Sequence, residues 1–475
     1  MLLKEMIKLI NIFFLLFFFI SSSAQKNTFH QLTSDSLSYF INKTNVIGSD
    51  TLKINLSRRF FGISSVENNT NTNTFIYGSG INMKYKKLIL FSSLDFISGN
   101  YNSQIINFQD SLGIIPEFGR EKHRYKIHAS YKINKFFNSD FGFGKHFIGD
   151  GYRSILLSDN SYSYPYLKLS TSFGKIKYYN LYTAISDIQL SNQDRKKYKA
   201  IHFLDIEINK FIRVGVFEAV LWQDRDESYV RGFDLEYLNP IIFYRPVEFS
   251  KHSPDNVLMG STFNINYYNT NLYGQLVLDD LNISRARDGD DGYTVENSNG
   301  FFQNKFGYQI GLKNKNKYFQ SLIEYNQVQP YTFAHKEPMQ SYTHYNQALA
   351  HPLGANFKEF TSLVEFTVNK WNINVKFTSA DVGLDSLNTH YGQNIFLSDF
   401  EAQIDGQQYS YGNFNGQGVK TRINSFKLEA SYPIKWADVF GSIFYIKKKS
   451  DLIDQTSLWY SIGLRTFPFS VFRDY

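Results

Sequence analysis

The sequence predicts an all-β protein, an antiparallel transmembrane β-barrel of the outer-membrane type with about 18 strands. Three observations predict this fold class. Segments of about ten residues alternate apolar and polar side chains, and tight turns alternate with long loops between these segments. Aromatic residues also make up 17% of the chain, with 45 Phe and 34 Tyr. A barrel accounts for all three, because its strands face lipid on one side and a wet interior on the other.

The N-terminus has the three parts of a secretory signal peptide. Lys4 and Lys8 supply positive charge, residues 9–20 form an apolar run, and small residues ending at Ala24 form a cleavage site. The apolar run is too short to cross a bilayer comfortably, which argues against a retained membrane anchor. The predicted division of the chain is a signal peptide at 1–24, a short periplasmic N-terminal segment at 25–50 and the barrel at 51–475.

Composition and charge exclude several other classes of protein. The chain contains no Cys, so it has no disulfide framework, no thiolate nucleophile, no Cys-based zinc site and no cysteine for a lipid anchor. After the signal peptide there is no further apolar run of about 20 residues, which a bundle of transmembrane helices would need. A net charge of +7 over 475 residues is too mild to indicate a nucleic-acid partner.

The alternation is clearest in three segments. In residues 305–313 the even-numbered positions are Phe, Tyr, Ile and Leu, whereas the odd-numbered positions are Lys, Gly and Gln. Residues 371–377 and 458–465 repeat this pattern. A strand places successive side chains on opposite faces, so one face of each segment is apolar and the other polar. Small and polar residues on the second face suit a wet barrel interior better than a packed core.

Short turns and long loops alternate along the chain. Turns rich in Asn, Gly and Lys, which join neighbouring antiparallel strands, fall at 85–87, 133–135, 173–175, 209–210, 269–271, 314–316, 369–370 and 433–435. Long connections fall at 99–122, 148–164, 186–198, 222–260, 283–303, 329–359 and 381–422. Outer-membrane barrels show this asymmetry, with short periplasmic turns and long extracellular loops. A β-sandwich or propeller is the soluble alternative, but its connections need not sort by length to opposite ends.

Strand parity supports the strand number. The hairpins and the alternating segment at 456–467 leave an odd number of strands, and the alternating segment at 51–62 supplies the missing one. A barrel of about 18 strands has a lumen too wide for the side chains of its wall to fill. We therefore expect long extracellular loops, in particular 222–260, 329–359 and 381–422, to plug the lumen.

Three loop segments differ from the repetitive background. Residues 144–154 read GKHFIGDGYRS, residues 239–248 read NPIIFYRPVE, and residues 351–356 read HPLGAN. Taken together, these motifs resemble the capsule-assembly Wzi family of outer-membrane proteins, in the Bacteroidetes branch that includes the gliding-motility protein RemB. The motifs span roughly residues 120–360, and the rest of the chain is similar by barrel pattern alone.

The resemblance implies both a fold and a function. It implies an outer-membrane barrel with the strand number inferred above. It also implies a lectin-like role, in which the protein holds capsular polysaccharide at the cell surface and catalyses no reaction. The better-known members of the family also carry a periplasmic helical element, whereas residues 25–50 of this chain are too short for a helical bundle. The chain therefore departs from the family pattern on the periplasmic side.

Two long loops carry the side chains that a sugar-binding site needs. Sugar C–H faces stack on aromatic rings, sugar hydroxyls need hydrogen-bond partners, and cationic side chains pair with acidic sugars. The predicted polysaccharide-binding residues are Trp222, Arg225, Asp226, Arg231, Tyr237, Tyr244 and Arg245 in the first loop and Tyr331, Tyr345 and Asn346 in the second. The alternative is structural: Arg–Asp pairs would join loops into a lid, and aromatic residues near strand ends would belong to an interfacial girdle.

The first motif supplies four further predicted functional residues, Lys145, His146, Asp150 and Arg153. His146, Asp150 and Ser154 have the residue types of a hydrolytic triad, but residue types do not establish the geometry that a triad needs. Two roles stay open for the motif as a whole: loop or plug architecture, and direct contact with a ligand.

The sequence offers little for metal or cofactor chemistry. It contains no nucleophile elbow, no metalloprotease motif and no phosphate-binding loop, and no cofactor is predicted. The three His between 335 and 351 share one loop, but their spacing matches no compact metal-ligand pattern. Asp288, Asp290 and Asp291 form an acidic turn that resembles half of a calcium-binding loop, and weak calcium binding is the metal role that the sequence leaves open.

The sequence and the resemblance together predict a non-enzymatic outer-membrane barrel that binds or anchors capsular or other surface polysaccharide. Two alternatives stay open: an accessory of gliding motility or adhesin display at the cell surface, and a passive solute channel. The predicted partners are outer-membrane lipid, the capsular polysaccharide or exopolysaccharide itself, and proteins of polysaccharide export or of the gliding machinery. Nucleic acid is not among them.

Overall fold

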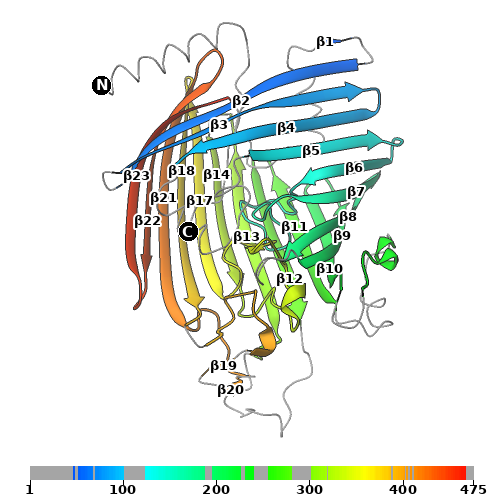
Figure 1. Cartoon of the computed structure of the whole chain (residues 1–475), viewed down its shortest axis with the longest axis vertical. Coiled ribbons are helices and arrows are strands. Elements are labelled where there is room, and N and C mark those ends of the chain that lie inside the picture. Colours follow the sequence, from blue (N-terminus) through cyan, green and yellow to red (C-terminus); the bar gives the residue numbers. More distant parts are fainter. Residues whose placement is uncertain are drawn as a thin grey trace.

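A computed structural model describes residues 47–48, 52–67, 70–100, 123–187, 195–225, 230–239, 255–280, 301–317, 319–386, 389–401, 403–404, 407–408 and 411–466. These residues form a closed antiparallel β-barrel of 18 long strands (Figure 1). The strand number and the fold class predicted from the sequence are confirmed. The predicted signal peptide lies outside the described residues, and so does most of the predicted N-terminal segment.

The long strands are β2 (Leu52–Glu67), β3 (Thr70–Tyr85), β4 (Leu88–Gly99), β5 (His123–Lys132), β6 (Phe137–Gly144), β7 (Tyr164–Phe173), β8 (Ile176–Asp187), β9 (Arg195–Glu207), β10 (Ile212–Gln223), β11 (Asn256–Tyr267), β12 (Thr270–Asp280), β13 (Lys305–Lys315), β14 (Phe319–Val328), β17 (Phe357–Val368), β18 (Trp371–Leu384), β21 (Val419–Pro433), β22 (Asp438–Lys449) and β23 (Asp454–Arg465). Short elements in the connections are β1 (Ile47–Gly48), β15 (Thr343–His344), β16 (Gln347–Ala348), β19 (Gln403–Ile404), β20 (Gln407–Gln408) and the 3-10 helices η1 (Leu235–Leu238), η2 (Pro338–Gln340) and η3 (Asp399–Glu401).

The barrel closes where the first long strand meets the last. β2 pairs with β23 from Phe61 opposite Arg465 to Glu67 opposite Trp459. The earlier part of β2 carries the two-residue strand β1 on the same edge. Every neighbouring pair of long strands is antiparallel, and closure leaves no open edge of unpaired N–H and C=O groups, as a structure in hydrocarbon requires.

The connections sort into two ends of the barrel. At the short-turn end they comprise residues 86–87, 133–136, 174–175, 208–211, 268–269, 316–318, 369–370 and 434–437, which coincide with the predicted turns. At the opposite, long-loop end lie the long connections between β4 and β5, β6 and β7, β10 and β11, β12 and β13, β14 and β17, and β18 and β21. Three connections at this end are shorter than the others: those from β2 to β3 and from β22 to β23, and that from β8 to β9, which spans 188–194 where a long connection was predicted at 186–198. The predicted asymmetry therefore holds for most loops but not for all.

Asparagine side chains close several of the short turns. Asn134 Oδ1 accepts hydrogen bonds from the backbone N–H groups of Phe136 and Phe137 at 2.8 and 3.0 Å. Asn209 Oδ1 does the same for Phe211 and Ile212, also at 2.8 and 3.0 Å. These local bonds satisfy N–H groups where the ladder ends, which is why Asn favours such turns.

Successive side chains point to opposite sides of the wall, as predicted. In β13, Tyr308, Ile310 and Leu312 are exposed on the outer face, whereas Lys305 and Gln309 are buried on the inner face. Exposed large apolar side chains recur on the outer face of strands around the barrel. The described part of the chain contains no helix that is long and apolar enough to cross a membrane.

Candidate functional site

Two loops occupy the lumen, residues 145–163 between β6 and β7 and residues 329–356 between β14 and β17; we call them the lumen plug. Their apolar side chains form one buried cluster with inward-facing residues of the wall. The loop members of this cluster are Ile155, Leu156, Leu157, Phe333, Ala334, Tyr342, Ala348, Leu349, Ala350, Leu353 and Ala355. The two loops also bond to each other, since the Ser158 N–H donates to the Leu349 carbonyl at 2.8 Å. This arrangement agrees with the prediction that long loops fill the lumen.

The loops that form the plug are only partly those expected. The loop at 329–359 folds inward, and Ile395 of the loop at 381–422 joins the same apolar cluster. The described part of 222–260 instead packs outside the wall, and the first motif loop takes its place in the lumen. The signal for this was the run Ile155-Leu156-Leu157, because three consecutive apolar residues in a loop need a buried environment.

Glu324, on the inner face of β14, anchors the motif loop to the wall. Its carboxylate accepts the backbone N–H groups of Tyr152 and Arg153 at 2.8 and 3.0 Å, and the hydroxyl of Tyr273 at 2.8 Å. Gln309 Nε2 donates to the Arg153 carbonyl at 3.0 Å. A buried carboxylate is tolerated only when its oxygens are satisfied in this way, so the loop backbone and the wall stabilise each other.

A second buried carboxylate, Glu359 on β17, joins both loops of the plug. Arg153 Nη2 lies 3.3 Å from its Oε1, and His351 Nε2 lies 2.5 Å from its Oε2. Asn326 Nδ2 donates to the same carboxylate at 3.1 Å. The His351 ring also stacks on Phe357, with 4.2 Å between ring centroids. The first and third sequence motifs therefore meet at one side chain.

The other residues of the first motif have separate partners. Lys145 is half-buried at the start of the loop. His146 is half-buried and packs against two rings, stacked on Tyr164 at 5.8 Å and edge-on to Tyr166 at 4.3 Å. Burial, together with nearby cationic groups, lowers the pKa of His146, so its imidazole is neutral. Asp150 accepts two hydrogen bonds of 2.8 Å from Arg213.

These contacts do not assemble a hydrolytic triad. Ser154 Oγ donates to the Ile148 carbonyl at 2.6 Å and lies 3.2 Å from Gln275 Oε1. Asp150 is held by Arg213, and His146 packs against tyrosine rings. Asp150, Arg153 and Ser154 are therefore held by bonds to the wall and within the motif loop.

The predicted residues of the loop after β10 lie on the outside of the wall. Leu221 joins the lumen cluster, so its neighbour Trp222 faces outward. Trp222 is fully buried there against Tyr237, with ring centroids 4.6 Å apart, and its Nε1–H donates to the Gly232 carbonyl at 3.2 Å. In Figure 1 a green coil, η1, lies beside β10, outside the barrel.

Arg231 ties this outer loop together. It donates to Asp234 at 2.8 Å and to Asp255 at 2.7 Å, and the Tyr237 hydroxyl donates to Asp255 at 2.5 Å. Burial opposes the charge of Arg231, but the bonds to Asp255 and Asp234 outweigh it and raise the pKa of the guanidinium. This arrangement has the form of the structural alternative, in which Arg–Asp pairs hold a loop in place.

Several predicted residues fall outside the part of the chain that the structure describes: Asp226, Tyr244, Arg245, Asp288, Asp290 and Asp291. Arg225 is described and exposed, with its Nε 3.5 Å from Asp224. Among the described residues, no group of three or more His, Asp or Glu is placed to hold a metal ion.

Tyr345 and Asn346 form a tight turn within the plug. Both have positive φ, 48° and 54°, as a two-residue hairpin loop with a primed turn needs, and they connect β15 to β16. The Tyr345 ring packs edge-on against Tyr162 of the motif loop, with centroids 5.2 Å apart. Both residues are half-buried, and they join the two loops of the plug.

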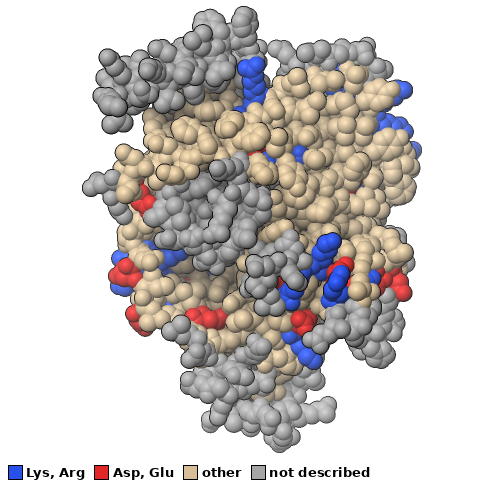
Figure 2. All heavy atoms as spheres, in the orientation of Figure 1, with Lys and Arg blue, Asp and Glu red and all other residues tan. Residues whose placement is uncertain are grey.

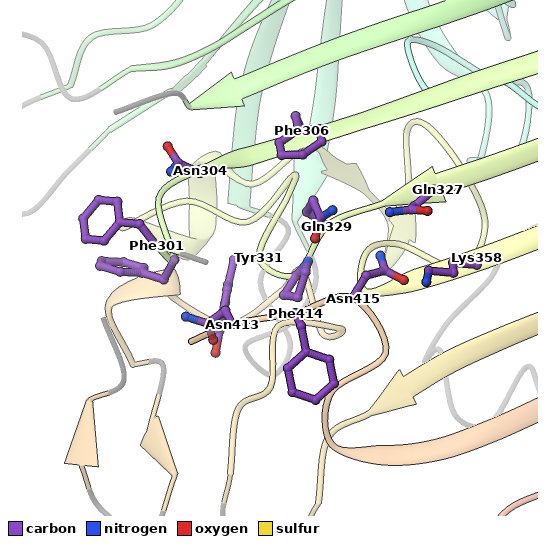
Figure 3. Close-up of a pocket in the computed structure, with 12 residues that line it drawn as sticks. Phe301, Asn304, Phe306, Gln327, Gln329, Tyr331, Lys358, Asn413, Phe414 and Asn415 are labelled. Atoms are coloured by element: carbon purple, nitrogen blue, oxygen red, sulfur yellow. The ribbon is translucent and has the colours of Figure 1, made fainter. Parts of the chain in front are cut away.

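A cavity of about 530 Å³, the rim pocket, lies at the long-loop end. It is bounded by the loops that precede β13 and β21, by the start of the loop after β14, and by outward-facing residues of β13, β14 and β17. Its aromatic residues are Phe301, Phe302, Phe306, Tyr331 and Phe414, and its polar residues are Asn304, Gln327, Gln329, Lys358, Asn413 and Asn415. Figure 3 shows Tyr331 and Gln329 near its centre, Phe301 to the left, Phe414 below, and Lys358 to the right.

The rim pocket combines fixed walls with an accessible aromatic face. Tyr331 is buried, and its hydroxyl donates to the His390 carbonyl at 2.9 Å. Asn415 Nδ2 donates to the carbonyls of Val328 and Phe357 at 2.5 and 3.1 Å, which positions the loop before β21. Phe414 is 56% exposed. The described lining contains no pair of carboxylates of the kind that glycoside hydrolysis uses.

Sequence reasoning identified Tyr331 but missed the rest of this pocket. Phe301, Phe302 and Asn413 to Asn415 lie in the loops 283–303 and 381–422, for which the sequence predicts length but no ligand contact. The run Asn413-Phe414-Asn415 pairs an aromatic ring with two amides, which is the composition that selected the other loops. The composition of this run is therefore a sequence signal for binding. It indicates a site only once folding brings three separate loops together around it.

Comparison with known proteins supports the fold. No protein-family model and no curated protein sequence matches the chain. Among solved structures it is similar to Wzi of Escherichia coli, described as an outer-membrane protein involved in group 1 capsule assembly and as a carbohydrate-binding β-barrel. The identity is 11%, the similarity covers 87% of this chain and 85% of that one, and the TM-score is 0.55.

The chain is also similar to Pseudomonas aeruginosa OprD, at 9% identity over 87% of this chain and 94% of that one, with a TM-score of 0.47. Pseudomonas aeruginosa OpdK with vanillate has 8% identity, coverage of 87% and 98%, and the same TM-score of 0.47. At these identities the likeness shows the fold alone. The fold defines an outer-membrane β-barrel with a Wzi-like architecture.

Proposed function

We propose that this protein binds surface polysaccharide through the rim pocket and catalyses no reaction on it. The observation that carries the proposal is the exposed Phe414 ring, with the side-chain amides of Asn413 and Gln329 in the same pocket. Aromatic rings stack on the C–H faces of sugars, and side-chain amides both donate to and accept from sugar hydroxyls. The pocket lies at the long-loop end, which faces outward from the cell in barrels of this class.

Two further features support this proposal over the alternatives. The lumen plug, with its buried apolar cluster, argues against a passive solute channel. The Wzi structure is described as a carbohydrate-binding barrel, which favours the same class of ligand for a chain of similar fold. A role in gliding motility or adhesin display rests on the sequence resemblance, and the described residues add nothing to it.

A glycan array probed with the purified full chain in detergent tests the proposal. We expect binding to capsular or other surface polysaccharides, and at least about tenfold weaker binding for Phe414→Ala, because the variant loses an aromatic face without disturbing a core. Phe173→Ala is the matched control, since Phe173 is 65% exposed at the short-turn end and far from the pocket. It should bind as the wild type does.

Two outcomes contradict the proposal. One is the absence of any bound polysaccharide on the array, and the other is equal binding by Phe414→Ala and the wild type, which would place the ligand elsewhere. The anchoring role has a cellular test as well. A deletion strain that retains its surface polysaccharide as before would show that the protein does not hold polysaccharide at the cell.

A further inference from the structure

The outer faces of β18, β21 and β22 carry a band of apolar side chains. Antiparallel register aligns Phe377 with Phe426 and Phe426 with Tyr445, which form an aromatic row across the three strands. Toward the short-turn end the same faces continue with Val375, Leu428 and Ile443. Inward-facing neighbours on these strands, such as Ile423 and Ile446, belong to the lumen cluster, so the aromatic row faces lipid.

Beyond the aromatic row, toward the long-loop end, the same outer faces become cationic. Lys447 lies two residues beyond Tyr445, about 7 Å along the strand, and Lys449 two residues farther. Register aligns Lys449 with Arg422 and Lys447 with Asn424. Lys420 of β21 and Lys358 of β17 are exposed nearby and line the same cavity.

The cations of this region outnumber its carboxylates. Asp381 is engaged by Arg422 through two hydrogen bonds of 2.7 and 2.9 Å. Asp454 lies opposite Lys449 in register, and Asp451 lines the cavity. The cations are Lys358, Lys420, Arg422, Lys447 and Lys449. An excess of positive charge therefore remains after these carboxylates are counted.

These side chains surround a cavity of about 850 Å³ on the outer wall, the wall groove. Asn424 and Ser450 add uncharged hydrogen-bonding groups to its lining. It adjoins the rim pocket, with which it shares Lys358, Phe414 and Asn415. Figure 2 shows red and blue side chains toward the lower end of the wall around β21 to β23, at the left, below a tan upper part. The volume is within the range of sites that hold a small molecule or a headgroup.

We propose that the wall groove binds the phosphate of a lipid headgroup in the outer leaflet of the membrane. The cations extend from the same strand faces as the lipid-facing aromatic row, so in a bilayer their neighbours at this level are headgroups. Clusters of Lys and Arg at a membrane interface bind anionic headgroups, and long basic side chains reach outward from the hydrocarbon to do so. The proposal goes beyond polysaccharide binding and does not depend on it.

Native mass spectrometry of the full chain in detergent tests this assignment. The probes are diphosphorylated lipid A, the same lipid without phosphates, and phosphatidylcholine. We expect retention of the diphosphorylated lipid only, and at least about tenfold weaker retention by the variant K420Q/K447Q/K449Q, because each cation near the surface contributes to anionic lipid binding. The matched control, K135Q/K210Q/K370Q, removes the same charge from exposed lysines at the short-turn end and should retain the lipid as the wild type does.

Folding is checked for each variant by the heat-dependent shift of the folded barrel on a denaturing gel. Equal retention of the lipid with and without phosphates would overturn the assignment, and so would unchanged retention by the folded groove variant. Displacement of the lipid by inorganic phosphate would assign the groove to a free anion instead, and displacement by an acidic polysaccharide would assign it to that polymer. The groove variant should keep its binding on the glycan array, so the two proposed sites can fail independently.

Discussion

Arg153 of the loop between β6 and β7 and Glu359 of β17 form an ion pair of 3.3 Å in the interior of the barrel, where they are 1% and 0% exposed. Glu359 also bonds to His351 of the second plug loop. The pair therefore links both parts of the lumen plug to the wall.

Replacing Glu359 with Gln should destabilise the folded barrel by about 3–5 kcal/mol, because the buried charge of Arg153 loses its compensating partner. Urea unfolding of the detergent-solubilised chain measures the effect. Arg225→Gln is the comparison: Arg225 is exposed and its Nε lies 3.5 Å from Asp224, so the expected change is within about 1 kcal/mol. Similar losses of stability in the two variants would show that the buried ion pair stabilises the barrel no more than the contact between Arg225 and Asp224 does.

Gly151→Ala should loosen the plug. A Cβ at Gly151 would lie 2.2 Å from Glu324 Oε2 and 2.6 Å from the Arg153 carbonyl, so the motif loop must move off its anchor. We expect a loss of about 1–3 kcal/mol in stability and measurable ion conductance in planar bilayers, where the wild type stays closed. At Gly144 an added Cβ meets only the Tyr166 ring at 3.5 Å, an ordinary contact, so Gly144→Ala should behave as wild type. A closed Gly151→Ala barrel would refute the proposed anchor.

The buried His344 should make the plug sensitive to acid. Its Nδ1 accepts the Ser186 N–H at 3.0 Å, and burial, reinforced by Lys199 and Lys197, lowers the pKa of His344 to about 3. The ordinary pKa of an unfolded His is about 6.5, so this stabilisation is complete above that pH. It is lost as the pH falls toward 3, by about 1.4 kcal/mol per pH unit.

Melting temperatures recorded between neutral pH and pH 4 check this dependence. His344→Gln keeps a side-chain acceptor but cannot take up the proton, so its stability should fall less steeply with acid than that of the wild type. Other buried groups contribute to both curves equally, including His146, whose pKa is also lowered by burial. Parallel curves for the two proteins would show that His344 is not the group that titrates.

Trp222→Ala should act on stability rather than on ligand binding. The ring is fully buried against Tyr237, so its removal should cost about 3–5 kcal/mol and loosen the outer loop. Polysaccharide binding at the rim pocket should persist. Trp371→Ala serves as control, because Trp371 is exposed on the outer face and its loss leaves no buried cavity. A folded Trp222→Ala protein that no longer binds polysaccharide would restore Trp222 as a sugar contact.

The fold could be predicted to a large extent from local pattern. The alternation in residues 305–313 assigns Lys305 and Gln309 to the inside and Tyr308 to the outside, because side chains of a strand alternate between its two faces. Asn134 and Asn209 mark turns through bonds to their own neighbouring backbone. Strand alternation and Asn turns each depend on residues only a few positions apart, so both can be predicted without knowledge of the tertiary structure.

The candidate site could be predicted only in part. Arg153 and His351 belong to sequence motifs, but nothing in their spacing shows that both reach Glu359. Trp222 and Tyr331 were selected for the same chemistry, yet one is buried outside the wall and the other lines the rim pocket. Whether an aromatic residue packs or binds depends on which segment covers it, and that segment can be distant in the chain.

Local sequence pattern is enough to predict the wall of antiparallel strands, the face of each strand that meets lipid, and the positions of the hairpin turns. The folded structure is needed to show which loops enter the lumen, which lie outside it, and which side chains form the rim pocket and the wall groove. The difference lies in how far apart along the chain the interacting residues are. Alternation and turns depend on neighbours a few residues apart, whereas plug and pocket depend on burial and hydrogen bonds between loops that closure of the barrel brings together.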